Sequence, residues 1–130
     1  MVGGSDAGVN TVSPLLDVYS QEVQHMGKPG AGQHAKAANQ VMIANNIVGV
    51  CEALLYAQRT GLNHEQMIGL LNKGGAASFQ LGVLGPRMLK RDFDPGFYVE
   101  HFVKDLGIVL DECRRMNLFV PGTSQAFQLY

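Results

Sequence analysis

The chain has 130 residues, the size of one domain, with 46% hydrophobic and 16% charged residues. Its formal net charge of −1 provides no global field to attract nucleic acid or an anionic membrane, so we expect neither as a partner. We find neither a run of about 18 apolar residues nor a basic, apolar leader, which predicts a soluble, cytoplasmic protein; an organellar location of a longer parent stays open. The two cysteines and four histidines lack ligand spacing, so we predict no metal site.

The first 29 residues differ in character from the rest. Residues 1–4 could end a strand, residues 9–25 have the apolar spacing of a short helix, and residues 24–26 could form another brief strand. Two partial strands and a helix do not make a sheet with its own core. We therefore interpret residues 1–29 as a short α/β stub of a domain whose main body is missing.

The remainder of the chain predicts an all-α body, because no segment alternates with period two. From about residue 32 to residue 59 apolar residues surround the helical wheel, so this long helix should be buried on most sides. Gly61 suits the position after its end, and Asn63 suits the cap of the next helix. Further helices are expected over 64–72, over 77–90 with an interruption at Gly85–Pro86, over 97–116, and from Pro121 to the chain end, which truncates the last one.

The helix expected over 97–116 has a clear apolar stripe that begins at Val99 and should face the core. The opposite face is polar, with charged residues one turn apart. Phe97 and Ile108 nevertheless lie on that polar face. Apolar residues there suggest that something covers part of it, which a missing domain or a ligand would do.

Lys36 lies in line with the stripe of the long helix that becomes wholly apolar one turn later, within about 40° on a wheel of about 100° per residue. Asn39 and Gln40 add amides to the same face, while Gly30 and Gly32 would let a ligand approach the backbone closely. A lysine is unfavourable beside the positive end of a helix dipole. Two interpretations stay open here: a surface lysine with its ammonium in water, or a lysine in a cleft that acts as a general acid and base.

The segment Gly30–Ala35 imitates the dinucleotide-binding pattern G-x-G-x-x-A. That pattern needs a buried apolar strand directly before it and an acidic residue about 20 positions later, at the end of a second strand. The preceding residues form a poor strand, and Glu52 has the right distance but lies within the predicted long helix. We therefore reject a Rossmann interpretation of these glycines.

Three motifs in chain order carry a family resemblance. Residues 30–40, G-A-G-Q-H-A-K-A-A-N-Q, are similar to the motif G-x-G-x-x-x-K-x-x-N-[NQ] of the β-hydroxyacid dehydrogenases, which include 3-hydroxyisobutyrate dehydrogenase and tartronate semialdehyde reductase. Residues 97–106 resemble the family's second signature, F-x-x-x-x-x-x-K-D-L. Residues 1–4, M-V-G-G, resemble the end of a strand late in the family's N-terminal domain. The pair Asn39–Gln40 departs from the His-Asn of the phosphogluconate dehydrogenases, which favours the small-acid reductases.

The resemblance implies the helical C-terminal domain of a 6-phosphogluconate dehydrogenase-like fold. Residues 1–29 would then be a remnant of the N-terminal Rossmann domain, and residues 30–130 the all-helical C-terminal domain, with an interdomain helix at about 32–59 and its end truncated. The family's helical domain often takes part in oligomerisation, so a homo-oligomer is implied. The alternative is a non-catalytic oligomerisation or partner-binding module derived from the same family.

The resemblance also implies a reaction, hydride transfer between a nicotinamide and a small β-hydroxyacid or semialdehyde. NAD or NADP would be bound mainly by the missing N-terminal domain, so the 130-residue segment alone should be inactive. The implied site residues are Lys36 as catalytic proton donor and acceptor; Asn39, Gly30, Gly32, Phe97 and Asp105 as substrate-binding residues; and Lys104 near the cofactor.

Overall fold

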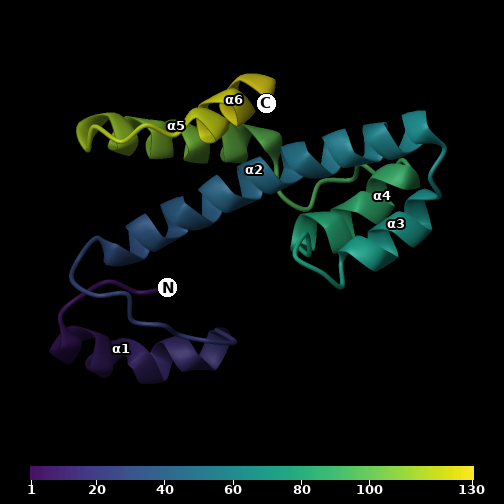
Figure 1. The fold of residues 1–130 in the computed structure, drawn as a ribbon. Coiled ribbons are helices and arrows are strands. Elements are labelled where there is room, and N and C mark those ends of the chain that lie inside the picture. The colour runs from purple at the N-terminus through teal and green to yellow at the C-terminus, as the bar shows by residue number, and fades with distance from the viewer. The chain divides into compact units, whose positions relative to one another are not determined.

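The structure, a computed structural model, describes residues 1–130 and consists of helices joined by turns and loops, with no strand (Figure 1). The predicted helical class is thus confirmed. The chain forms two compact units, Met1–Gln40 and Val41–Tyr130. The domain boundary predicted after residue 29 concerns a longer protein and stays a prediction.

In the first unit, helix α1 (Asp6–Tyr19) connects two short extended segments that meet in a single parallel bridge between Val2 and His25. The Val2 amide donates to Gln24 O at 2.9 Å, and the Met26 amide donates to Val2 O at 2.8 Å. The partial strands expected at 1–4 and 24–26 therefore pair with each other. They are too short to count as strands.

The prediction of a helix over 9–25 is wrong at both ends. The helix begins at Asp6 because the Ser5 hydroxyl accepts a hydrogen bond from the Gly8 amide at 3.2 Å, and an acidic residue suits the first turn. It ends at Tyr19, and Ser20 has an extended backbone. The first residue of α1 is therefore set by a side-chain cap, which apolar spacing alone does not predict.

Helix α2 (Ala31–Thr60) follows Gly30, whose φ of +95° suits glycine, and ends before Gly61, whose φ is +73°. Helix α3 (His64–Leu71) begins where Asn63 Oδ1 accepts a hydrogen bond from the Gln66 amide at 2.9 Å. The roles predicted for Gly61 and Asn63 are therefore confirmed. Both follow from local backbone chemistry that the sequence states directly.

The expected burial of α2 on most sides is wrong. Within the second unit, Ala44, Val50 and Leu54 are buried, whereas the side chains of Leu55 and Tyr56 are 62% and 69% exposed. The reason is that the other helices of the unit cover only part of the α2 surface. By length and composition alone, α2 is also the one helix able to span a membrane, which is weak evidence because the core helices of soluble proteins meet the same measure.

Two apolar clusters hold the second unit together, and α2 contributes to both. One joins α2 to α5 (Val99–Arg115) and α6 (Pro121–Leu129). The other joins α2 to α3, to the π-helix η1 (Gln80–Leu84) and to α4 (Gly85–Leu89). The buried members of the first cluster are Ala44, Phe102, Leu106 and Ala126, and those of the second are Val50, Leu54, Ile68 and Leu81.

The interruption predicted at Gly85–Pro86 is wrong, because η1 runs directly into α4. Pro86 lies in the first turn of α4, directly after the π-helical turn of η1. Gly85 permits the close approach of α3, since a Cβ there would lie 3.3 Å from Ile68 Cδ1. The helical segment also begins later than predicted, near Ser78, whose hydroxyl accepts from the Leu81 amide at 3.0 Å.

Helix α5 begins at Val99 and ends at Arg115, slightly inside the predicted range 97–116. Its buried stripe is confirmed, but Val99 is 56% exposed and does not belong to it. Val99 is the first helical residue and precedes Phe102, the first buried residue of α5. Phe97 and Ile108 are 56% and 55% exposed, as expected for apolar residues on the outer face.

Candidate functional site

The side chains of Lys36 and Asn39 meet at one oxygen atom. Lys36 Nζ donates a hydrogen bond to Gln40 Oε1 at 3.0 Å, and Asn39 Nδ2 donates to the same oxygen at 3.1 Å. Lys36 and Gln40 lie one turn apart on α2, the spacing at which helical side chains meet. Gln40 is only 3% exposed, whereas Lys36 and Asn39 reach the surface. The structure therefore groups the two polar residues that the sequence singled out.

Within the first unit, the positive charge of Lys36 has no carboxylate partner. The ion pairs of the chain involve other residues, and the acceptor that Lys36 contacts is a neutral amide oxygen. An ammonium group has three donors and this one uses one of them for Gln40. Such a group can still donate to, and stabilise, an anionic ligand or an oxygen that gains negative charge.

The two glycines before Lys36 differ in their surroundings. Gly30 has positive φ and open space where a Cβ would lie. Gly32 is buried, and a Cβ there would lie 3.0 Å from Gly3 N and 3.1 Å from Met1 O. Gly32 thus has a packing reason to be glycine. The predicted substrate contact of both glycines stays a prediction.

Phe97, Lys104 and Asp105 belong to the second unit, whereas Lys36 and Asn39 belong to the first. Lys104 Nζ pairs with Asp105 Oδ1 at 2.6 Å; the side chain of Lys104 is 62% exposed and that of Asp105 17%. The ring of Phe97, just before α5, lies 6.3 Å from that of Phe102, edge to face. The structure joins Lys104 to Asp105 and describes Phe97 only in its own aromatic cluster.

The residues of this chain could contact part of a nicotinamide cofactor but could not bind all of it. The exposed ammonium of Lys104 could contact an anionic cofactor. A dinucleotide also needs a glycine-rich turn after a strand of a parallel sheet, and residues 1–130 contain one isolated bridge instead. The residues also contain no group of three or more His, Cys, Asp or Glu arranged for a metal ion.

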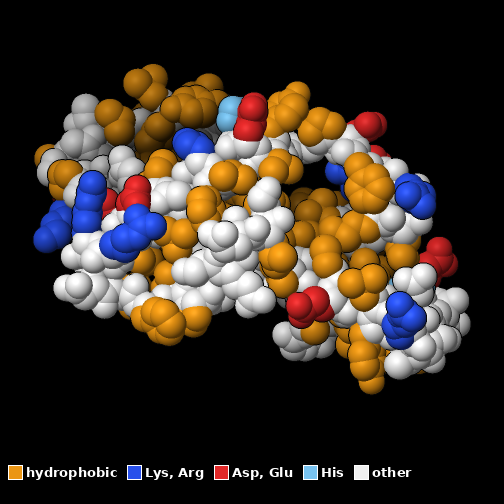
Figure 2. Space-filling view, turned by 90° about the horizontal axis from the view of Figure 1, so that it is seen from above, with side chains coloured by type: hydrophobic (Ala, Val, Ile, Leu, Met, Phe, Trp, Pro, Cys, Tyr) orange, Lys and Arg blue, Asp and Glu red, His pale blue; other side chains and the backbone are white.

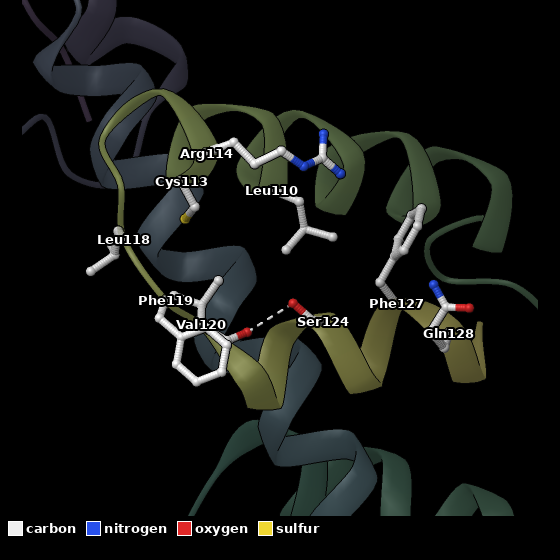
Figure 3. A pocket seen from close by; sticks show the side chains of 9 residues that line it. All are labelled: Leu110, Cys113, Arg114, Leu118, Phe119, Val120, Ser124, Phe127 and Gln128. Carbon is white, nitrogen blue, oxygen red and sulfur yellow. Dashed lines mark hydrogen bonds between the residues drawn. The ribbon is translucent and has the colours of Figure 1, made fainter.

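A further open groove of about 290 Å³ lies between α5, α6 and the turn that joins them (Figure 3). Cys113 and Leu110 line it from α5 and Phe127 from α6, and Phe119 of the turn is 85% exposed. None of the site residues predicted from the sequence lines this groove. No pattern in the sequence indicates this groove, because it depends on a turn in which Asn117 adopts a positive φ of 53°.

Two further groups, Asp92 and Cys51, have pKa values shifted from their ordinary range. Arg87 binds Asp92 through Nε at 2.8 Å and Nη2 at 2.9 Å, and the hydrogen bond from Arg87 is the main reason that the pKa of Asp92 is lowered. Burial, followed by the charge of Glu52, raises the pKa of the Cys51 thiol. A thiol with a raised pKa is a poor nucleophile at neutral pH. Cys51 and Cys113 are both free, and neither adds a catalytic candidate.

Residues 30–130 match the family model described as "NAD-binding of NADP-dependent 3-hydroxyisobutyrate dehydrogenase". The chain belongs to the 3-hydroxyisobutyrate dehydrogenase family. The resemblance carried by the residue 30–40 motif is thereby confirmed, as is the prediction of NAD or NADP as the cofactor class of the family. The matched region begins at Gly30, the first residue of the motif.

Curated relatives and solved structures agree with this assignment. The chain is 48% identical over 128 residues to a probable 3-hydroxyisobutyrate dehydrogenase-like 1, mitochondrial, of Arabidopsis thaliana, covering 98% of this chain and 38% of that protein. It is 38% identical to 2-hydroxy-3-oxopropionate reductase of Escherichia coli, covering 100% of this chain and 44% of that protein. The solved 3-hydroxyisobutyrate dehydrogenase of Mycobacterium tuberculosis with L-serine matches at a TM-score of 0.92 and 26% identity, covering 100% of this chain and 47% of that one.

The chain therefore spans less than half the length of these members of the 3-hydroxyisobutyrate dehydrogenase family. The family fixes the kind of chemistry to be considered, which is oxidation and reduction of small hydroxyacids. It does not by itself assign a role to Lys36, Asn39 or any other residue of this chain. Those roles have to be argued from the geometry.

Proposed function

We propose that this chain contributes the catalytic lysine, Lys36, to an NAD(P)-dependent oxidoreductase that transfers hydride between nicotinamide and a small β-hydroxyacid or semialdehyde. The observation that carries the proposal is the pairing of Lys36 and Asn39 on one buried oxygen, a neutral acceptor for the lysine charge. The substrate class is supported by the names of relatives such as 2-hydroxy-3-oxopropionate reductase.

In the proposed reaction, Lys36 manages the proton at the substrate oxygen. When a carbonyl is reduced, the ammonium donates a proton to the oxygen; when a hydroxyl is oxidised, the neutral amine accepts it. The nicotinamide supplies or accepts the hydride. The Asn39 amide has two N–H donors and gives one to Gln40, so the other remains for a substrate oxygen.

The other predicted site residues complete the proposal. Gly30 and Gly32 let the substrate lie against the backbone before α2, and Phe97 and Asp105 line the cleft. Lys104 contacts the cofactor, and its pairing with Asp105 supports a fixed position for its ammonium. Each of these roles rests on the matched motifs rather than on a contact with Lys36.

We extend the proposal to the organisation of the full-length protein. Residues 30–130 would be its helical C-terminal domain, which also mediates homo-oligomerisation, and residues 1–29 the end of a Rossmann domain that binds most of the cofactor. The shares of 38–47% of the relatives' lengths leave room for such a domain. The 130-residue segment alone should therefore show no turnover with NADH or NADPH. A cytoplasmic location stays a prediction.

The proposal is tested by replacing Lys36 in the full-length protein. Lys36→Ala should lower kcat by about 10²–10⁴-fold, the usual effect of losing a general acid and base. Lys36→Arg should fail to restore it, because a guanidinium does not release its proton near neutral pH. Lys73→Ala removes an exposed lysine elsewhere and should leave kcat unchanged. A fall of less than about tenfold for Lys36→Ala contradicts the proposal.

The alternative function, a non-catalytic helical module, has one observation in its favour. Large apolar side chains are exposed to solvent in many places (Figure 2). On α1 the side chains of Leu15, Val18 and Tyr19 are 68%, 83% and 74% exposed, and their spacing of three and four residues places them on one side of the helix. The alternative predicts that the full-length Lys36→Ala variant keeps its catalytic rate while surface variants such as Val18→Glu lose assembly.

A further inference from the structure

Gln40 differs from the other members of the polar cluster because it is buried. Its exposed fraction is 3%, yet its Oε1 accepts hydrogen bonds from both Lys36 and Asn39. An ammonium and the amide nitrogen of a side chain can only donate, so both require an oxygen as their partner. The two donors therefore fix which end of the Gln40 amide faces them.

We propose that Gln40 is a positioning residue that holds Lys36 and Asn39 in register through one buried oxygen, while its neutrality leaves the lysine proton transferable. The inference rests on the proposed function of Lys36. It adds a residue that does not itself contact the reacting atoms in that proposal. Its proposed effect on the reaction passes through the two donors, Lys36 and Asn39.

The first part of the argument is geometric. Lys36 has a flexible four-carbon stem and reaches the surface, so without a partner its ammonium would sample many rotamers. A buried acceptor one helical turn away, at 3.0 Å from Nζ, restricts the positions that the ammonium adopts. Because Asn39 Nδ2 binds the same atom at 3.1 Å, the two donors are also fixed relative to each other. Catalytic groups need such support from a packed neighbour.

The second part is electrostatic. A carboxylate at the position of the Gln40 amide would satisfy the same two donors and would be nearly identical in shape. It would also stabilise the charged form of the lysine and make its proton harder to release. A neutral acceptor orients the ammonium without this cost. The amide is thus suited to a group that must both donate and accept a proton in one reaction cycle.

The test uses two variants of the full-length protein. Gln40→Met removes the acceptor at similar volume, and kcat should fall about 10- to 100-fold, as expected when a catalytic group loses its position. Gln40→Glu keeps the shape and adds charge, so the limb of the pH–rate profile that reports the lysine should move to higher pH by about one unit or more. Gln58→Glu makes the same charge change at an exposed position of α2 and should leave the profile unchanged.

The outcomes separate this inference from the proposed function. If Lys36→Ala leaves kcat unchanged, the proposed function fails. If Lys36→Ala abolishes turnover but Gln40→Met keeps the wild-type kcat and Gln40→Glu has the profile of Gln58→Glu, only the role of Gln40 is overturned. If Gln40→Met does not fold, the profile of the isosteric Gln40→Glu variant decides alone: a shift supports the inference and coincidence with Gln58→Glu overturns it.

Discussion

The backbone of Gly3 lies directly against the first turn of α2, since a Cβ on Gly3 would come within 2.8 Å of Gly32 N. The relationship is reciprocal, because a Cβ on Gly32 would lie 3.0 Å from Gly3 N. Two glycines, 29 positions apart in the chain, thus allow an extended segment to pack on the helix one turn before Lys36. Neither could be replaced without moving a backbone.

Gly3→Ala should therefore destabilise the protein by about 1–3 kcal/mol, the range of overpacking substitutions. It should also lower kcat, because the start of α2 carries Lys36. The shift of the urea midpoint measures the first effect and steady-state kinetics the second. Gly69→Ala is the control: it lies within α3 with open space for a Cβ, and should stabilise by about 0.5–1 kcal/mol. Equal midpoints for the two variants would contradict the packing argument.

The hydrogen bond from Asn45 Nδ2 to Thr123 Oγ1, 3.3 Å long, joins α2 to α6 at a buried threonine that is 2% exposed. Thr123→Val keeps the shape but loses the acceptor, so the free energy of unfolding should fall by about 0.5–1.5 kcal/mol. A double-mutant cycle with Asn45→Ala should return a coupling of similar size. Ser124→Ala, at the exposed next position, should change the free energy of unfolding by less than about 0.5 kcal/mol. Zero coupling would show that the hydrogen bond contributes nothing.

The Arg87–Asp92 pair predicts that the free energy of unfolding depends on pH in the acid range. Because the hydrogen bond from Arg87 lowers the pKa of Asp92 in the folded protein, its stabilisation is present above the unfolded carboxyl pKa of about 3.9 and is lost as pH falls through the folded value. The stability difference between wild type and Asp92→Asn should be full at pH 7 and should shrink towards pH 3. Urea titrations at several pH values measure it.

A matched variant exists in the same loop. Arg87 Nη2 binds Asp94 through its backbone oxygen at 2.6 Å and not through its carboxyl, so Asp94→Asn should retain that hydrogen bond. Its stability should depend on pH much as the wild type does. A difference between wild type and Asp92→Asn that grows towards low pH would refute the assignment.

The exposed apolar side chains predict that the 130-residue segment self-associates. The groove between α5 and α6 and the outer face of α1 both offer such side chains, with Phe119 at 85% and Val18 at 83% exposure. Sedimentation of the segment at micromolar concentrations should show species larger than a monomer, and Phe119→Ser or Val18→Glu should reduce them. A single monomeric species across that range would contradict the prediction.

Local signals in the sequence predicted much of this fold. The positions of Gly61, Asn63 and Pro121 mark helix boundaries because caps and proline act within a few residues. The grouping of Lys36 with Gln40 also followed from helical spacing. Apolar spacing does not predict the start of α1, because the capping Ser5 lies several residues before the apolar pattern begins.

Features that depend on distant segments could not be predicted. Nothing near Gly3 in the sequence indicates that Gly32 is its neighbour, and the groove depends on how the turn after Arg115 places Phe119. The burial predicted for α2 is too high, because an apolar sequence does not show which faces of a helix the rest of the chain covers. The pairing of Lys36 and Asn39 on one oxygen likewise needed side-chain positions, which spacing alone does not supply.

The two apolar clusters of the second unit have a kinetic consequence. Leu106 and Ala126 belong to one cluster, Ile68 and Leu81 to the other, and only α2 contributes to both. Amide hydrogen exchange should therefore reveal two separate opening events, one releasing α3, η1 and α4 and the other α5 and α6, with the shared stretch of α2 exchanging last. The two parts of the unit would then unfold locally and independently of each other, while the shared stretch of α2 stays folded.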